Sequence, residues 1–201
     1  MEEDFFCITS EFATHRLILL HGWGADADDL LPLGENLANL LEKKIEIISL
    51  RAPEMHPQGF GRQWYGLFPA DWKAAKNAIN DLLIRLKTLN DSRIPLDKTV
   101  LLGFSQGGAM ALAVGCELPL AGLIGCSAYP HPDLNVPKNS PLVFLSHGQF
   151  DEIVPIEASR KLLKLFEKQN NLVEFHCFDG GHEIPQILYE NIRIFLESCF
   201  K

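Results

Sequence analysis

One serine stands in a setting that would make it a nucleophile. Residues 103–107 read Gly-Phe-Ser-Gln-Gly, the pattern G-x-S-x-G centred on Ser105. The apolar run 99–102 precedes it directly, and the small-residue segment 107–111 follows it. A strand, a sharp turn and a helix in this order lift a serine hydroxyl out of a sheet, with the positive end of the helix behind it. The context therefore predicts a nucleophilic Ser105, and the alternative is a serine that only caps a helix.

A nucleophilic serine needs a general base, and the base needs an acid that orients it. Asp151 follows the apolar run 142–146, and His182 follows the apolar run 173–178. Both therefore stand in loops after late strands of the expected sheet. Serine, acid and histidine also occur in the chain order that enzymes with such a serine turn use. We expect Ser105, Asp151 and His182 to form a catalytic triad.

Other acids and histidines compete for these roles. Asp179 lies three residues before the candidate base and Glu152 is adjacent to the candidate acid, but neither combines a strand end with a glycine-supported turn. Among the remaining histidines, His176 is expected to pack within a strand. His147 is expected to shape its loop or to contact substrate. The other three are expected in loops or at the surface: His15, His56 and His131.

The oxyanion formed by acyl transfer needs two N–H donors. The glycine-containing loop 21–26 follows the early apolar run 16–20, where the second donor of such a site should lie. Its position predicts the backbone N–H groups of Trp23 and Gln106 as the pair of donors. The alternative is a glycine-rich turn with no part in catalysis.

These residues depend on elements that alternate along the chain. Strands are expected over 16–20, 45–50, 99–103, 120–127, 142–147 and 172–178, and helices over 30–41, 72–89, 106–116, 157–169 and 184–200. Alternating strands and helices predict an α/β fold with a mostly parallel central sheet and helices on both faces. The sequence shows no repeat, linker or low-complexity tract, so we expect a single domain over residues 1–201.

Two segments fit neither period, 51–71 and 128–141, and both are rich in proline. Ligands of open parallel sheets bind beyond the carboxyl ends of the strands, where such loops meet. We therefore expect aromatic side chains of the first loop to line an apolar substrate site, although they would also serve simply to pack the loop down. The residues expected there are Phe60, Trp64, Tyr65 and Phe68, with Ile153 from the loop of the candidate acid.

Composition narrows the range of partners and cofactors. The 201 residues carry a net charge of -8, which argues against nucleic acid or an anionic membrane as the main partner. The five cysteines lack metal-binding spacing, so we expect no metal or cofactor, and reduced, buried thiols for Cys7, Cys116, Cys126 and Cys177. An acidic start without a signal-peptide pattern or a long apolar stretch predicts a soluble cytoplasmic protein, as a monomer or homodimer.

Four short sequence blocks together resemble a known protein family, and the resemblance covers about residues 16–198. They are residues 20–24 (Leu-His-Gly-Trp-Gly), 103–108 (Gly-Phe-Ser-Gln-Gly-Gly), 147–155 (His-Gly-Gln-Phe-Asp-Glu-Ile-Val-Pro) and 180–184 (Gly-Gly-His-Glu-Ile). In this order they resemble the phospholipase/carboxylesterase family of α/β-hydrolases, which includes acyl-protein thioesterases and small bacterial carboxylesterases. The resemblance implies the α/β-hydrolase fold, the same triad of Ser105, Asp151 and His182, and oxyanion N–H groups from Trp23 and Gln106.

The activity implied is that of a serine hydrolase that cleaves carboxylic esters through an acyl-enzyme, without a cofactor. Small soluble esters are the first expectation, and acyl-protein or lysophospholipid substrates the second. A binding protein on the same fold without turnover, or another acyl-transfer reaction, is the remaining alternative.

Two positions depart from the family pattern. Gly66 follows the pair Trp64-Tyr65, where members often have an acid, and Trp23 stands where members commonly carry a small or aliphatic residue. Both changes bear on the substrate rather than on the chemistry. The chain also leaves no room for a separate cap domain, so residues 51–71 would have to serve as any lid.

Overall fold

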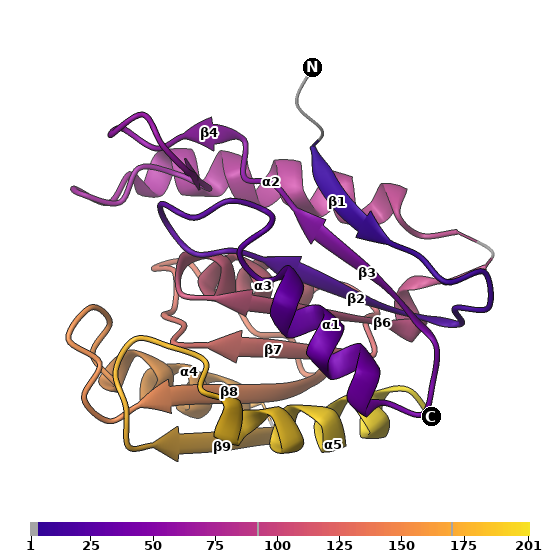
Figure 1. The fold of residues 1–201 in the computed structure, drawn as a ribbon. Coiled ribbons are helices and arrows are strands. Elements are labelled where there is room, and N and C mark those ends of the chain that lie inside the picture. Colours follow the sequence, from indigo (N-terminus) through magenta and orange to yellow (C-terminus); the bar gives the residue numbers. More distant parts are fainter. Residues whose placement is uncertain (1–3, 92, 170) are drawn as a thin grey trace.

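A seven-stranded sheet forms the centre of the molecule (Figure 1). The computed structural model describes residues 4–91, 93–169 and 171–201. Within them the strand order is β1-β3-β2-β6-β7-β8-β9, and every neighbouring pair is parallel except β1 and β3. The strands are β1 (Phe5–Ile8), β2 (His15–Leu20), β3 (Ile45–Leu50), β6 (Thr99–Phe104), β7 (Gly122–Cys126), β8 (Leu142–Gly148) and β9 (Val173–Phe178). The expected mostly parallel α/β sheet is confirmed.

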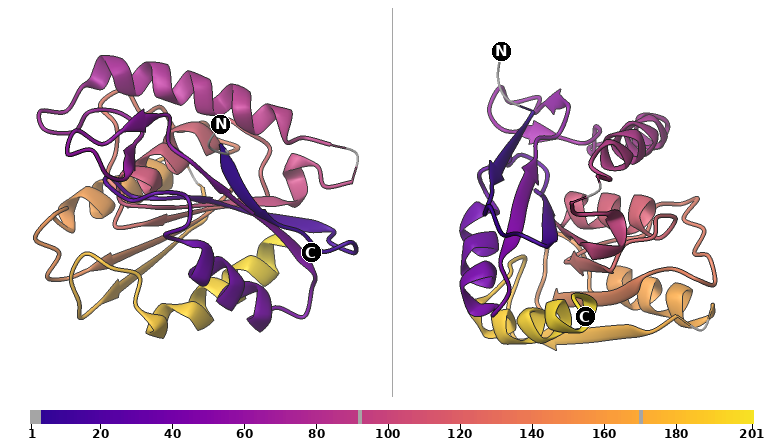
Figure 2. Two further views of the ribbon diagram at one scale, coloured as in Figure 1. Left: turned by 45° about the horizontal axis from the view of Figure 1, so that its top comes forward. Right: turned by 90° about the vertical axis from the view of Figure 1, so that its right-hand side faces the viewer.

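Helices cover both faces of this sheet, as Figure 2 shows. One face carries α1 (Leu31–Leu40) and α5 (Tyr189–Cys199), and the other carries α2 (Trp72–Thr88), α3 (Gln106–Gly115) and α4 (Glu157–Glu167). Alternate residues of a strand therefore enter different cores: Leu17 packs towards α1 and α5, and Ile18 towards α2 and α3. A strand buried on both faces reads as a continuous apolar run, which is why β2 is evident in the sequence.

The loop 51–71 contains structure that its sequence did not reveal. It forms a two-stranded hairpin of β4 (Glu54–Met55) and β5 (Arg62–Gln63), paired antiparallel. The hairpin is fastened to the loop after β2, because the N–H of Gly24 donates to the carbonyl of Arg62 at 2.8 Å. Residues 51–71 thus belong to the body of the domain at the edge where the strands end.

Two other elements differ from expectation. Strand β1 was not expected, because it is a short and mostly exposed edge strand whose residues show no clear period. The closing helix was expected from residue 184, but α5 begins at Tyr189 after a 3-10 turn, η2 (Gln186–Leu188). Pro185 stands at the start of that turn, and proline suits a helix start better than a helix interior.

The three histidines expected in loops or at the surface are all buried, although two of them do lie in loops. The ring of His15 packs on Phe200 with centroids 4.7 Å apart, and the ring of His56 packs on Trp23 at 4.1 Å. His131 is buried against the Tyr65 hydroxyl, 2.8 Å from its Nε2. His56 and His131 belong to loops that fold back onto the body, and His15 is the first residue of a central strand. Their burial comes from tertiary packing, which local sequence does not show.

All four cysteines expected to be free thiols are free, but the expected burial holds for only two of them. Cys116 and Cys126 are buried free thiols, whereas Cys7 and Cys177 are exposed. The exposed pair lie on β1 and β9, the two edge strands of the sheet. Among the described residues no set of His, Cys, Asp and Glu side chains is grouped so as to hold a metal ion. None of the helices described has both the length and the hydropathy needed to cross a bilayer.

Candidate active site

Ser105 occupies a strained turn between β6 and α3. Its backbone angles are φ 52° and ψ -117°, a region that residues with a side chain rarely adopt. The turn is so tight that a Cβ on Gly103 would lie 2.1 Å from the carbonyl oxygen of Gly107. The N–H of Ser105 donates to the carbonyl of Cys126 at 2.8 Å, which ties the turn to the neighbouring strand. These contacts hold the serine at the carboxyl end of the sheet despite its strain.

Asp151 and His182 are brought together from two different loops. Asp151 follows β8, His182 follows β9, and the Nδ1–H of His182 donates to Oδ2 of Asp151 at 2.7 Å. The other carboxylate oxygen, Oδ1, accepts the N–H groups of Ile153 at 3.0 Å and Val154 at 2.8 Å. Because an ionised carboxylate only accepts, the ring proton lies on Nδ1. The Nε2 atom of neutral His182 is then available to take a proton.

Electrostatics favour the ionised form of Asp151. Burial raises the pKa of its carboxyl, but the N–H of Val154 and the ring of His182 donate to the carboxylate and outweigh the burial. The pKa of Asp151 is therefore below the ordinary value of 3.8. A carboxylate that accepts several such bonds stays charged at neutral pH and supports a positive charge on the histidine.

His147 supports this carboxylate from beneath. Its Nε2–H donates to the carbonyl of Val154 at 2.7 Å, and the same nitrogen lies 3.3 Å from Oδ2 of Asp151. Its Nδ1 is 2.6 Å from the hydroxyl of Ser159. His147 thus fixes the turn that holds the acid. Of the competing acids, Asp179 is exposed and accepts from Gln149 instead, and Glu152 is exposed.

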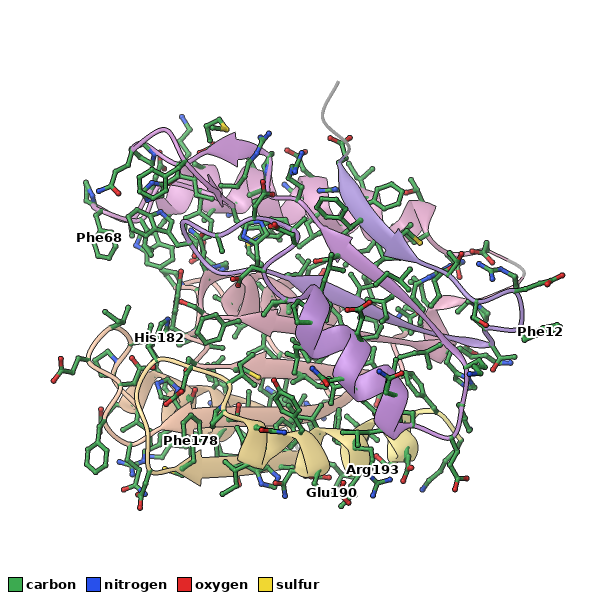
Figure 3. All side chains as sticks on the ribbon, in the orientation of Figure 1. Phe12, Phe68, Phe178, His182, Glu190 and Arg193 are labelled. Atoms are coloured by element: carbon green, nitrogen blue, oxygen red, sulfur yellow. The ribbon has the colours of Figure 1, made fainter. Side chains whose placement is uncertain are left out.

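The serine turn and the histidine are neighbours at one edge of the sheet. The ring of Phe104, the residue before Ser105, lies 4.8 Å from the His182 ring between centroids. Both rings border a cavity of about 270 Å³, whose lining also includes Leu30, Ile184 and Tyr189. Figure 3 shows His182 on the same side of the molecule as Phe68, opposite Phe12.

The loop after β2 lies directly against the serine turn. A Cβ on Gly22 would come 3.5 Å from the Cβ of Ser105 and 3.3 Å from the Phe104 ring, so only a glycine fits here without displacement. Within the described residues, neither the N–H of Trp23 nor that of Gln106 donates to another protein group. Both donors belong to residues next to this contact, because Trp23 follows Gly22 and Gln106 follows Ser105.

A row of aromatic rings extends from this loop over 51–71. The Trp23 ring lies 5.1 Å from Phe68 and 4.1 Å from His56, and His56 lies 5.9 Å from Phe60. We call these four residues the aromatic row. Phe68 is 75% exposed, and Phe60 is also exposed. Ile153 is exposed on the turn of Asp151. The row offers apolar surface beside the candidate site.

Trp64 and Tyr65 lie beneath this surface. They are 2% and 0% exposed and belong to the core under α2 and α3. The indole Nε1–H of Trp64 donates to the carbonyl of His21 at 3.0 Å, and the Tyr65 hydroxyl is 2.7 Å from that of Tyr129. The contacts of these two residues are packing contacts. Packing of the loop was the alternative to a role in substrate binding that the sequence left open.

Comparison with known proteins decides the family. The sequence profile described as Phospholipase/Carboxylesterase matches residues 6–200, nearly the whole chain. The chain belongs to the phospholipase/carboxylesterase family. The resemblance of the four sequence blocks is confirmed, and the chain is accordingly a hydrolase of the carboxylesterase type.

Individual relatives within the phospholipase/carboxylesterase family agree with this. Acyl-protein thioesterase 1 of Yarrowia lipolytica is 27% identical over 190 residues, which cover 83% of each chain. Acyl-protein thioesterase 1 of Neurospora crassa is 31% identical over 144 residues, which cover 59% of this chain and just over half, 58%, of that relative. Among solved structures, esterase PE8 superposes with a TM-score of 0.85 at 27% identity, covering 96% of this chain and 97% of that one.

Proposed function

We propose that this family member is a serine hydrolase whose catalytic triad is Ser105, His182 and Asp151. The observation that carries the proposal is the 2.7 Å bond between His182 Nδ1 and Asp151 Oδ2. That bond leaves Nε2 free on a ring that packs on Phe104, the residue before the strained serine. A nucleophile, a base and an orienting acid are the three parts that acyl transfer to serine requires.

The proposed reaction has two stages. In the first, His182 Nε2 takes the proton of Ser105, and the serine oxygen attacks the carbonyl carbon of the ester. The backbone N–H groups of Trp23 and Gln106 bind the oxyanion that forms. His182 then gives its proton to the departing alcohol or thiol. In the second stage His182 activates water, which releases the acid from the acyl-enzyme.

The acyl chain would lie along the aromatic row. Phe60, Phe68 and Ile153 present exposed apolar side chains to it, while Trp64 and Tyr65 support the loop from below. The cavity beside His182 gives room for the leaving group, because the histidine must reach the departing atom. Small soluble esters are the proposed substrates.

Acyl thioesters on proteins are the second candidate, favoured by the relatives named acyl-protein thioesterase 1 and by the length of the aromatic row. Lysophospholipids would use the same surface. The net charge of -8 would not assist docking to an anionic membrane.

The proposal extends to the organisation of the protein. Residues 1–201 would form one α/β-hydrolase domain that works in the cytoplasm as a monomer or homodimer. Residues 51–71, which bear most of the aromatic row, would have to provide any lid.

The deciding experiment measures kcat/KM on p-nitrophenyl esters of about two to sixteen carbons and on acyl thioesters of the same lengths, with Ser105→Ala alongside. A rate that the variant loses supports the serine mechanism. A maximum at short esters supports the small-ester assignment, and a rise towards long thioesters supports the second candidate. Turnover that survives in Ser105→Ala would overturn the triad.

A further inference from the structure

Trp64 contacts both of the segments that meet at the serine turn. Its backbone N–H donates to Oε1 of Gln106 at 3.0 Å, and its indole Nε1–H donates to the carbonyl of His21 at 3.0 Å. Gln106 follows Ser105 at the start of α3, and His21 opens the loop that contains Trp23. One residue thus binds both segments that carry the proposed oxyanion donors.

The side chain of Gln106 is bound at two points, one on Trp64 and one on Tyr65. While Oε1 accepts from Trp64, the Nε2–H of the same side-chain amide donates to the carbonyl of Tyr65 at 2.8 Å. Gln106 is fully buried, so both bonds are shielded from water. A planar amide held at both ends cannot rotate, and this fixes the residue whose own N–H faces the oxyanion.

The contact with His21 reaches the point where the two segments touch. A Cβ on Gly107 would lie 2.4 Å from the His21 carbonyl oxygen, so that oxygen lies directly against the helix that follows the serine. The indole of Trp64 supplies this buried oxygen with a donor. A buried carbonyl left without a partner is destabilising, which favours keeping the bond.

The imidazole of His21 anchors the same loop at a second point. Its Nε2 accepts the N–H of Ala52 at 3.1 Å, and because an amide can only donate, the ring proton lies on Nδ1. Nδ1–H then donates to the carbonyl of Gly22 at 2.8 Å. The peptide that joins Gly22 to Trp23 is therefore oriented from its carbonyl end. With Trp64 holding His21 itself, the direction of the Trp23 N–H is set.

We propose that Trp64 is a positioning residue that keeps the N–H groups of Trp23 and Gln106 aimed at one point, the oxyanion. The inference rests on the proposed function and adds to it. Binding of the uncharged ester needs no such alignment, whereas the transition state does. Loss of the indole donor should therefore lower kcat and leave KM nearly unchanged.

The test replaces Trp64 with β-(3-benzothienyl)alanine, an isostere of tryptophan whose sulfur stands in place of Nε1–H. Trp64→Phe serves as a second variant made from ordinary amino acids. The matched control is Trp72→Phe, because Trp72 is 41% exposed on α2 and its ring also packs near Tyr65, at 6.1 Å. Active sites are counted with a fluorophosphonate, so that kcat refers to folded enzyme alone.

We expect kcat to fall about tenfold or more in both Trp64 variants, with KM within about twofold, because loss of a whole oxyanion donor lowers kcat about 100- to 1,000-fold. The affinity for a trifluoromethyl ketone, which binds as an oxyanion, should fall by the same factor as kcat/KM. The control should retain both constants. A lower melting temperature with unchanged kcat per site would overturn the proposal.

The outcome separates this inference from the proposed function. If Ser105→Ala is inactive and the Trp64 variants turn over normally, the triad stands and the positioning role fails. If Ser105→Ala remains active, the proposed function itself fails. The positioning role of Trp64 then fails with it, because it rests on that function.

Discussion

Asp151 holds His182 with one carboxylate oxygen and the backbone of its own turn with the other. Oδ2 accepts from the histidine Nδ1 at 2.7 Å, and Oδ1 accepts from two backbone N–H groups. The carboxylate therefore cannot swing away from the ring without breaking its own turn. This bidirectional anchoring fixes the tautomer of His182, on which the proposed base function depends.

Asp151→Asn should lower kcat by about four orders of magnitude with little change in KM. An amide at this position can offer an N–H to the ring, and this favours the tautomer whose proton lies on Nε2, which cannot act as a base. Steady-state kinetics on a p-nitrophenyl ester measure the effect. Asp179→Asn is the control, because Asp179 is exposed and bonded to Gln149, and it should behave as wild type. Equal losses in the two variants would contradict the assignment of the acid.

Ser105→Gly should be more stable than Ser105→Ala. Both lack the hydroxyl, but only glycine adopts φ 52° and ψ -117° without strain. Relief of about 1–3 kcal/mol of strain exceeds the cost of the more flexible unfolded chain, about 0.4–1 kcal/mol. Calorimetry should show a melting temperature about 2–4 °C higher per kcal/mol gained. An alanine variant as stable as the glycine variant would show that the turn is not strained.

Phe68→Ala should reduce kcat/KM for long acyl chains more than for short ones. The ring is 75% exposed and packs on Trp23, so its loss removes apolar surface from the aromatic row. Each methylene buried there contributes about 0.8 kcal/mol at most, and so the ratio of long-chain to short-chain kcat/KM should drop about tenfold. Phe12→Ala is the matched control, since Phe12 is 76% exposed at the opposite side of the molecule (Figure 3). A uniform loss at all chain lengths would place the acyl chain elsewhere.

His131 should make the protein less stable as the pH falls from about 6.5 to 4. Burial lowers the pKa of its imidazole from 6.5 to about 4, so in this range the unfolded chain binds a proton that the folded one refuses. The free energy of unfolding therefore decreases towards acid, by on the order of 3 kcal/mol at the lower end. Urea unfolding at several pH values measures it.

His131→Gln removes the titrating group and should flatten the pH dependence. His15 and His21 also have a pKa lowered mainly by burial, and they remain in the variant, so the difference between the two proteins isolates His131. Identical slopes in wild type and variant would mean that His131 takes up its proton without opening the fold.

The main strands and the candidate catalytic residues could be predicted because each depends on a short stretch of local sequence. The apolar run before Ser105 is a buried strand, and the glycines around the serine are required by a turn with no space for a Cβ. The edges of the sheet were harder to predict, because β1 lacks a clear hydrophobic pattern and Cys7 and Cys177 are exposed on the edge strands. An edge strand is defined by its partner, which the local sequence does not contain.

Contacts between loops were the hardest part to foresee. Nothing local distinguishes Phe68, which is exposed, from Trp64, which is buried, because both are aromatic residues of the same loop. The bond from Trp64 to His21 joins positions 43 residues apart, and that from Trp64 to Gln106 joins positions 42 apart. The His-Gly pair at 21 and 22 was the available signal, since a histidine before a glycine turn suggests a ring with backbone partners.

The central claim is that Ser105 is the nucleophile of an ester hydrolase, and active-site labelling tests it most directly. Protein is treated with a fluorophosphonate while hydrolysis of a p-nitrophenyl ester is followed, and the labelled peptide is identified by mass spectrometry. We predict one label per chain on Ser105, loss of activity in proportion to labelling, and no label in Ser105→Ala or in denatured protein. Activity that persists in fully labelled protein, or a label on another serine as activity is lost, would contradict the account.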